Sequence, residues 1–218
     1  MANILTENFT GSDSTQINGF NSWVANSTGL QIQSNKAAKT DNGSVWAYKS
    51  ASGWTGQRTA SCVWSRYTGA GQRYINYFVL GASDISSQAN FLNSGIQIIY
   101  ARPDSNAMNS SVYVFDGATL VTTNLAGYQF DGSDVTITFT MNSDGSGTAK
   151  FDQGANSITL SWSARTWTNG TGQYQGFYMD HSGNDGLGQT TRSQIDSISV
   201  DTPGGAPANT NSFFMLRM

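Results

Sequence analysis

The chain has 218 residues, which is most economically one domain with a large core, and only 11% of these residues are charged. Its 24 glycines, its many Ser, Thr and Asn residues and its 11 Phe, 9 Tyr and 6 Trp are typical of a β-rich, turn-rich globular protein and exclude a disordered chain. The net charge of −3 and the lack of any basic cluster disfavour a nucleic-acid partner.

No apolar run in the sequence approaches the roughly 20 residues that a membrane-spanning helix needs. Residues 1–11 lack the charged and apolar regions of a secretory signal. Cys62 is the single cysteine, which excludes an intrachain disulfide and a cysteine-based zinc site, and its alternating neighbours predict a buried strand thiol. We therefore expect a chain that folds in a reducing cytosol, a route that a virion protein released by lysis would follow.

The first half of the chain predicts short strands separated by turns. Phe20 and Trp23 are expected to anchor a long polar loop after the first strand, and the polar segment 83–93 has room for one helical turn. The expected strands are at residues 4–9, 30–32, 45–48, 58–67, 73–81 and 95–102.

The second half is organised around an antiparallel meander. Apolar residues alternate with threonines from Val135 to Met141, which is the period of a half-buried strand. After glycine-rich turns the chain is expected to return at 148–151 and again at 158–162. The other expected elements are a hairpin of 112–115 with 119–123, a loop at 164–173, a strand at 174–180, a loop at 181–188 and a last strand at 195–200.

A pattern of apolar spacing extends from the N-terminus to residue 201. Asn8-Phe9 is followed by a W-x(6)-L-x-I-x-x-N segment that begins at Trp23, then by the VTITFTMNSDGSG hairpin and the closing IDSISV. In these motifs the chain resembles concanavalin A-like (laminin-G-like) jelly rolls over about residues 3–201. The resemblance implies an all-β fold, a two-sheet antiparallel β-sandwich in which the first and last strands lie side by side.

Residues suited to catalysis are scarce. Glu7 is the only glutamate, so the strand with paired glutamates that is typical of glucan-hydrolysing relatives is missing. His181 is the only histidine, no G-x-S-x-G motif accompanies it, and we interpret it as a solvated loop residue. We expect no enzymatic activity. The aspartates that could replace glutamates stand mostly in turns, at Asp104, Asp116, Asp131 and Asp144.

The loop near His181 has a second interpretation. Asp180, Asn184 and Asp185 offer oxygen ligands on a glycine-rich backbone, which is what calcium prefers. The resemblance to lectin-like domains, many of which bind calcium in such loops, supports a calcium site here. The alternative is that these residues only form turns.

Two tryptophans are candidates for a carbohydrate-binding platform. Trp54 and Trp167 lie in polar, glycine-flanked loops, and Tyr67 and Tyr74 border another loop. The alternative is that each tryptophan folds over one end of the sandwich as a hydrophobic plug. The other tryptophans have strand spacing and are predicted to be core residues: Trp23, Trp46, Trp64 and Trp162.

The C-terminal end differs in composition from the rest of the chain. Residues 202–212 have the composition of a linker, and an apolar end follows. We expect this arm to dock into another protein of an assembly or into a neighbouring copy; the alternatives are that it packs on its own sandwich, is disordered or touches a membrane surface. The expected partner-binding residues are Phe213, Phe214, Met215 and Leu216.

These features favour a sandwich domain of residues 1–201 with an arm at 202–218. The leading hypothesis is a non-enzymatic structural protein on a phage virion surface, similar to capsid decoration or fibre proteins and attached through its arm to capsid or tail proteins. Homo-oligomers are common in such roles. The alternative is a lectin-like module that binds glycans through its loop tryptophans, with calcium as a possible ligand. Neither hypothesis involves a membrane span or nucleic acid.

Overall fold

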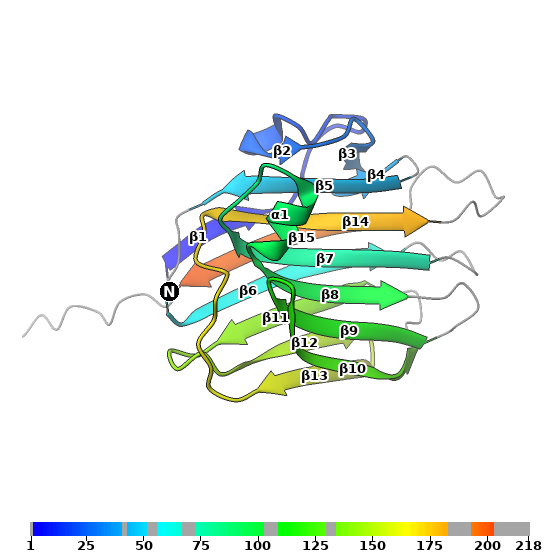
Figure 1. The fold of residues 1–218 in the computed structure, drawn as a ribbon. Helices are drawn as coiled ribbons and strands as arrows, with labels where there is room; N and C mark the ends of the chain where they lie inside the picture. The colour runs from blue at the N-terminus through cyan, green and yellow to red at the C-terminus, as the bar shows by residue number, and fades with distance from the viewer. Residues whose placement is uncertain are drawn as a thin grey trace, which may run out of the picture.

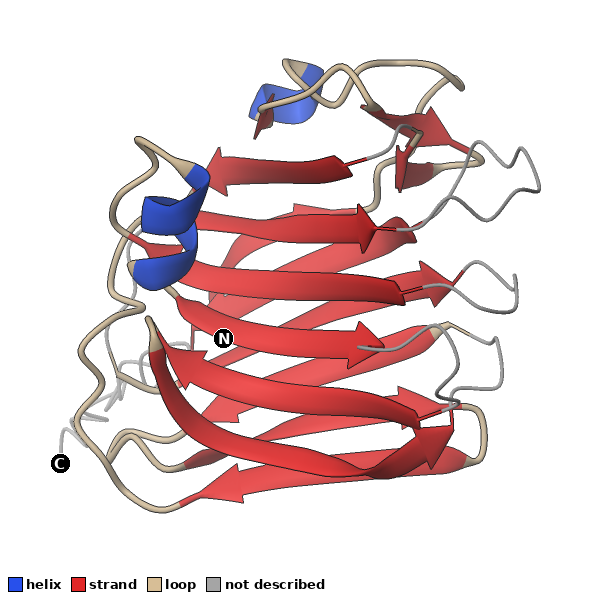
Figure 2. Cartoon of the chain, turned by 45° about the vertical axis from the view of Figure 1, so that its right-hand side comes forward, coloured by secondary structure: helices blue, strands red, loops and turns tan. Residues whose placement is uncertain are grey.

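The computed structural model describes residues 2–40, 43–51, 56–66, 73–102, 109–129, 134–182 and 193–202. These residues form two antiparallel sheets that pack face to face as a β-sandwich (Figure 1, Figure 2). The sheets carry short connections and almost no helix, so the all-β sandwich predicted from the sequence is confirmed. No helix among the described residues is long and apolar enough to cross a membrane.

The first sheet has eight strands, and β1 (Ala2–Glu7) pairs with β15 (Ser193–Thr202) beside the main path. Thr6 lies opposite Ser199, which confirms that the first and last strands are neighbours. The remaining order is β13 (Asn156–Trp162), β12 (Gly147–Gln153), β11 (Val135–Met141), β6 (Arg58–Arg66), β15, β4 (Lys36–Lys39) and β3 (Leu30–Gln33).

The second sheet has seven strands, and the short helix α1 (Gln88–Asn93) packs on it (Figure 1). Phe91 of this helix lies 5.2 Å from Trp46 between ring centroids. The strand order is β10 (Thr119–Gln129), β9 (Asn109–Asp116), β8 (Ile96–Arg102), β7 (Arg73–Ala82), β14 (Tyr174–Ser182), β5 (Gly43–Ser50) and β2 (Val24–Ala25), and a 3₁₀ turn spans Phe20–Ser22.

The meander has the predicted alternation. The apolar residues of β11 are buried between the sheets, and its threonines face outward. β11 pairs on one side with β12 and on the other with β6, where Ile137 lies opposite Cys62. Cys62 is fully buried, and this burial raises the pKa of its thiol.

The core between the sheets contains a cluster of four aromatic rings. Phe9, Trp23 and Trp64 pack around Phe177, with centroid distances of 6.0, 5.4 and 6.3 Å. Trp23 and Trp64 are therefore core residues, as predicted. Trp46 instead lies outside this cluster, packed with Tyr48 and Phe91 beneath α1, and Trp162 packs on the edge of the core.

The structure corrects several strand boundaries. The first strand ends at Glu7, because the buried Glu7 carboxylate accepts hydrogen bonds from the indole of Trp23 (3.1 Å) and from the main chain of Phe9 (3.3 Å), where φ is 48°. The strand predicted to end at Asp180 continues to Ser182. His181 was therefore wrongly assigned to a loop: it pairs with Gly43 and Tyr74 in the sheet.

Candidate functional site

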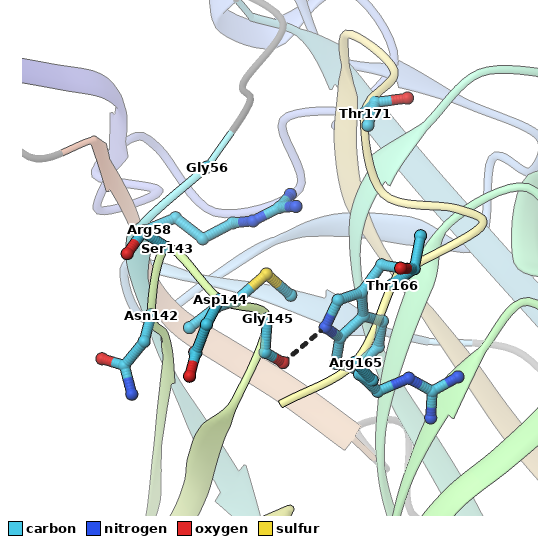
Figure 3. A pocket seen from close by; sticks show the side chains of 11 residues that line it. Gly56, Arg58, Asn142, Ser143, Asp144, Gly145, Arg165, Thr166 and Thr171 are labelled. Atoms are coloured by element: carbon cyan, nitrogen blue, oxygen red, sulfur yellow. Dashed lines mark hydrogen bonds between the residues drawn. The ribbon is translucent and has the colours of Figure 1, made fainter. Parts of the chain in front are cut away.

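A pocket of about 340 Å³ lies at one end of the sandwich (Figure 3). Its walls come from three segments: the β11–β12 turn at 142–145, the loop at 163–173, and the region where β6 begins. The 163–173 loop links β13 of the first sheet to β14 of the second, so it runs across the end of the sandwich (Figure 1). The fold therefore brings together residues about 110 positions apart in the sequence, such as Arg58 and Trp167.

The β11–β12 turn supplies polar groups to the pocket. Two main-chain bonds close the turn: the Asn142 N–H donates to the Ser146 carbonyl (2.8 Å), and the Gly145 N–H donates to the Asn142 carbonyl (3.0 Å). The Asp144 carboxylate accepts from the hydroxyl (2.6 Å) and the main-chain amide (2.9 Å) of Ser146. These hydrogen bonds lower the pKa of Asp144, so this side chain is an ionised acceptor at neutral pH.

Trp167 forms a fixed wall of the pocket. Its indole N–H donates to the Gly145 carbonyl at 2.8 Å, the hydrogen bond drawn in Figure 3. Its ring is edge-on to Trp162 (5.6 Å between centroids) and to Phe139 (6.4 Å). The partly buried ring thus packs on the end of the core and also lines the pocket. It combines features of both roles considered from the sequence, a carbohydrate-binding platform and a hydrophobic plug.

Arg165 covers one face of the Trp167 ring. Its guanidinium carbon lies 4.8 Å from the ring centroid, the geometry of a cation–π contact. In Figure 3 the guanidinium of Arg165 points away from the turn that carries Asn142 and Asp144. A ligand in the pocket can therefore reach only the ring surface that Arg165 leaves open.

Arg58 forms the inner side of the pocket. It is only 3% exposed, and one of its guanidinium nitrogens donates to the Gly170 carbonyl. Burial lowers the pKa of Arg58 to about 10, so it remains a cation at pH 7. Sequence reasoning missed both Arg58 and Arg165, because nothing in their local sequence indicates that they line the same pocket as Trp167.

Asp116 anchors the loop that carries Trp167. The sequence predicts a turn aspartate, and Asp116 does end β9 at the β9–β10 turn, but its side chain is fully buried. It accepts from the main-chain amides of Thr168 (2.9 Å) and Asn169 (2.8 Å), from both of their side chains (3.0 and 3.1 Å) and from Arg165 (3.2 Å). Burial alone would raise the pKa of Asp116, and the hydrogen bonds from Thr168 and Asn169 bring it below its usual value.

Of the four aromatic residues predicted to bind sugar, the structure places the side chain of Trp167 alone. Trp54 and Tyr67 lie outside the described residues, and Tyr74 belongs to β7 but its side chain is not described. The residues predicted to bind a partner through the C-terminal arm also lie outside the described residues: Phe213, Phe214, Met215 and Leu216.

The predicted calcium ligands are described only in part. Asp180 lies on β14, where its carboxylate accepts from the Ser44 hydroxyl at 3.3 Å. The Tyr178 hydroxyl lies 3.0 Å from the same serine. Asn184 and Asp185 lie outside the described residues, and the part of the chain that is described contains no group of three or more His, Cys, Asp or Glu suited to a metal ion.

The sequence matches no protein-family profile and no curated protein. The fold, by contrast, is similar to that of carbohydrate-binding lectins. The galactose complex of lectin UEA-II superimposes with a TM-score of 0.62 at 11% identity, covering 91% of this chain and 98% of the lectin, and lectin II from Ulex europaeus gives a TM-score of 0.61 at 10% identity.

Two carbohydrate-recognition structures from other proteins are also similar. The carbohydrate recognition domain of Emp47p has a TM-score of 0.55 at 14% identity, over 83% of this chain and 88% of that domain. The exoplasmic/lumenal domain of VIP36, bound to Ca²⁺ and Man3GlcNAc, has a TM-score of 0.54 at 11% identity, over 86% of each chain. At these identities the similarity establishes a lectin-like jelly-roll fold.

Proposed function

We propose that this protein is a non-catalytic carbohydrate-binding module and that the pocket beside Trp167 is its sugar site. The observation that carries the proposal is a rigidly held, partly exposed tryptophan flanked by an amide and an ionised carboxylate. The lectin-like fold supports it, because the similar structures include complexes with galactose and with Man3GlcNAc.

The chemistry of the pocket suits a sugar. The C–H groups of a pyranose can pack on the indole ring, since an aromatic surface offers a large apolar contact. The hydroxyl groups of the sugar can hydrogen-bond to Asn142, Asp144 and Thr166, which line the same pocket. A volume of about 340 Å³ lies at the lower end of the roughly 300–1,000 Å³ of small-molecule sites. The pocket therefore has room for one terminal sugar unit rather than a long chain.

A calcium ion at Asp180, Asn184 and Asp185 is a separate part of the proposal, and Ca²⁺ in the VIP36 structure is its support. Only Asp180 of these residues is described, and its carboxylate is already bonded to Ser44. Glycan binding measured with and without a chelator tests the metal independently of the Trp167 pocket.

The virion-surface role predicted from the sequence ranks second. Fold similarity supports the glycan-binding alternative, and the arm on which the virion hypothesis depends lies outside the described residues. Attachment to capsid or tail proteins remains a prediction that is compatible with glycan binding.

A glycan array with matched variants tests the proposal. We expect the wild-type chain to bind a defined set of terminal sugars and Trp167→Ala to lose that binding. Tyr113→Ala is the control, since Tyr113 is a partly buried aromatic residue of β9 that does not line the pocket. Equal binding by wild type and Trp167→Ala would move the sugar site elsewhere.

A further inference from the structure

We infer that Asp116 is the positioning residue of the Trp167 pocket: its buried carboxylate holds the 165–169 segment so that the indole ring is presented to a ligand in one fixed orientation. The consequence for ligand binding rests on the proposed function. The positioning itself rests on the contacts of this carboxylate.

The 163–173 loop has no regular secondary structure, so its conformation depends on bonds to other parts of the chain. Asp116 receives five hydrogen bonds from it, more than any other group that the loop contacts. Among the described residues the loop has other attachments, each a single bond: the main-chain amide of Arg165 donates to the Asp144 carbonyl and that of Gly172 to the Gly81 carbonyl. The Trp167 indole donates to the Gly145 carbonyl, Arg58 donates to the Gly170 carbonyl, and Ala51 donates to the Gln173 carbonyl. The two residues that follow Trp167, Thr168 and Asn169, thus depend mainly on this one side chain.

An ionised carboxylate is the group that this arrangement requires. One oxygen of Asp116 accepts from both donors of Asn169, and the other accepts from both donors of Thr168 and from Arg165. A carboxylate offers only acceptors, with about four lone-pair sites, whereas an amide would turn an N–H₂ toward one of these donor sets. The side chain is fully buried, so water cannot substitute for a lost acceptor.

Asp116 also controls the open face of the ring. Arg165 lies between the carboxylate and the indole, 3.2 Å from the first and 4.8 Å from the centroid of the second. The ion pair keeps the guanidinium on one side of Trp167, so a ligand must approach from the pocket side. Asp116 therefore sets both the orientation of the ring and the face that it offers.

The neighbouring residue shows how closely the hairpin turn fits the loop. Gly117 has a φ of 58°, and a Cβ added there would lie 2.5 Å from the Asn169 side-chain nitrogen and from the Asn93 carbonyl oxygen. Only glycine allows the loop to approach the turn this closely. The close contact between the β9–β10 turn and the loop therefore depends on Gly117 as well as on Asp116.

The test compares Asp116→Asn with Asp152→Asn in the full chain. Asp152 is a carboxylate on β12 that pairs with Lys150 and does not line the pocket, so it controls for loss of one charge. We expect Asp116→Asn to weaken glycan binding by roughly tenfold, by analogy with the lower end of the loss that follows mutation of a side chain that orients a metal ligand. We also expect faster amide hydrogen exchange at Thr168 and Asn169 and a shifted indole NMR signal of Trp167, with none of these in the control.

The two readouts separate the positioning role from a merely structural one. If Asp116→Asn lowers the melting temperature but leaves the Kd and the Trp167 indole signal of the folded protein unchanged, Asp116 is not a positioning residue. If the wild type binds no glycan, the proposed function fails, while the indole signal and the amide exchange still decide the positioning role.

A milder variant covers the case in which Asp116→Asn does not fold. Asn169→Ala removes one side-chain donor and leaves both main-chain amides on the carboxylate. It should shift the Trp167 indole signal in the same direction by a smaller amount. An unchanged signal in this variant would overturn the inference.

Discussion

One carbonyl oxygen links the two tryptophans at the end of the sandwich. The Gly145 carbonyl accepts from Trp162 (2.9 Å) and from Trp167 (2.8 Å), so both indole donors are satisfied within the protein. A ligand in the pocket therefore meets only the apolar surface of Trp167, and its polar groups must bond to other side chains. The position of this carbonyl depends on the backbone of Gly145, whose φ of 78° is a conformation that favours glycine.

Gly145→Ala tests this arrangement. A Cβ at this position would lie 1.9 Å from the Arg165 carbonyl oxygen, so the loop must move. We expect the free energy of unfolding to fall by about 2–4 kcal/mol, the cost of backbone strain plus collision, as measured by urea denaturation. Gly19→Ala is the control: Gly19 has a φ of 89° but no atom within 4 Å of an added Cβ, and it should lose only about 1–2 kcal/mol. Equal losses would show that the contact with Arg165 is unimportant.

The depressed pKa of Asp116 predicts a pH dependence of stability. Its folded-state pKa lies below its usual value of 3.8, so the stabilisation is complete above that pH and is lost as the pH falls through the lower folded-state pKa. The difference in free energy of unfolding between wild type and Asp116→Asn should be largest near neutral pH and shrink as the pH is lowered below about 4. Denaturation curves from neutral pH down into this acid range measure it, and a difference that is constant with pH would contradict the prediction.

At the scale of elements, β1 is held to the sandwich by one buried side chain as well as by its pairing with β15. Glu7 is 6% exposed and accepts from Trp23 (3.1 Å), Asn21 (3.2 Å) and Lys49 (3.3 Å). These donors belong to the loop after β1 and to β5 of the other sheet. The single glutamate of the chain thus joins the two sheets and has a structural role.

Glu7→Ala should therefore lower the free energy of unfolding by about 3–5 kcal/mol, because it leaves the buried Trp23 indole and the partly buried Lys49 ammonium without their acceptor. Thr6→Ala, an exposed position on the same strand, should change it by about 0.5 kcal/mol or less. Thermal melts and urea denaturation of both variants make the comparison. Similar effects of the two substitutions would mean that Glu7 does not hold β1 in place.

The elements that the sequence predicted well are those with local signals. The alternation from Val135 to Met141 indicated β11 because each apolar residue must face the core. β4 (Lys36–Lys39) was missed, since its sequence KAAK has no β-branched or aromatic residue and is held by its neighbours β3 and β15. Neighbouring strands also explain why β14 extends to His181, beyond its apolar residues. Its pairing with β5 and β7 continues there.

The site was less predictable than the fold. The glycine-flanked loop around Trp167 indicated a candidate binding residue, and the structure does place it on a pocket. The Asp116-Gly117 turn was recognised from local chemistry, but the donors that surround its carboxylate lie about 50 residues further along the chain. Contacts of this kind depend on tertiary packing, and no local pattern encodes them.

At the scale of the whole molecule, the first and last strands of the described sandwich, β1 and β15, pair with each other, and β15 ends at Thr202. A chain that ends at Thr202 keeps every described contact. We expect it to melt at the same temperature as the full chain and to keep its glycan binding, as measured by circular dichroism and by the array.

The same truncated chain tests the arm. Under the virion hypothesis the arm at 202–218 carries the attachment, and the truncated chain keeps only its first residue. A pull-down with capsid or tail proteins should therefore succeed with the full chain and fail with the truncated one. Association of both chains, or of neither, would contradict attachment through the arm.

The central claim is that a sugar binds against Trp167, and an NMR titration of the indole N–H signals tests it most directly. The protein has six tryptophans, so each of six signals reports on one ring. With a terminal sugar selected from the array, we predict a saturable shift of the Trp167 signal, while the buried Trp23 and Trp64 signals stay in place. A saturable shift of Trp54 alone, or no shift of any indole when the sugar binds, would contradict a sugar site in this pocket.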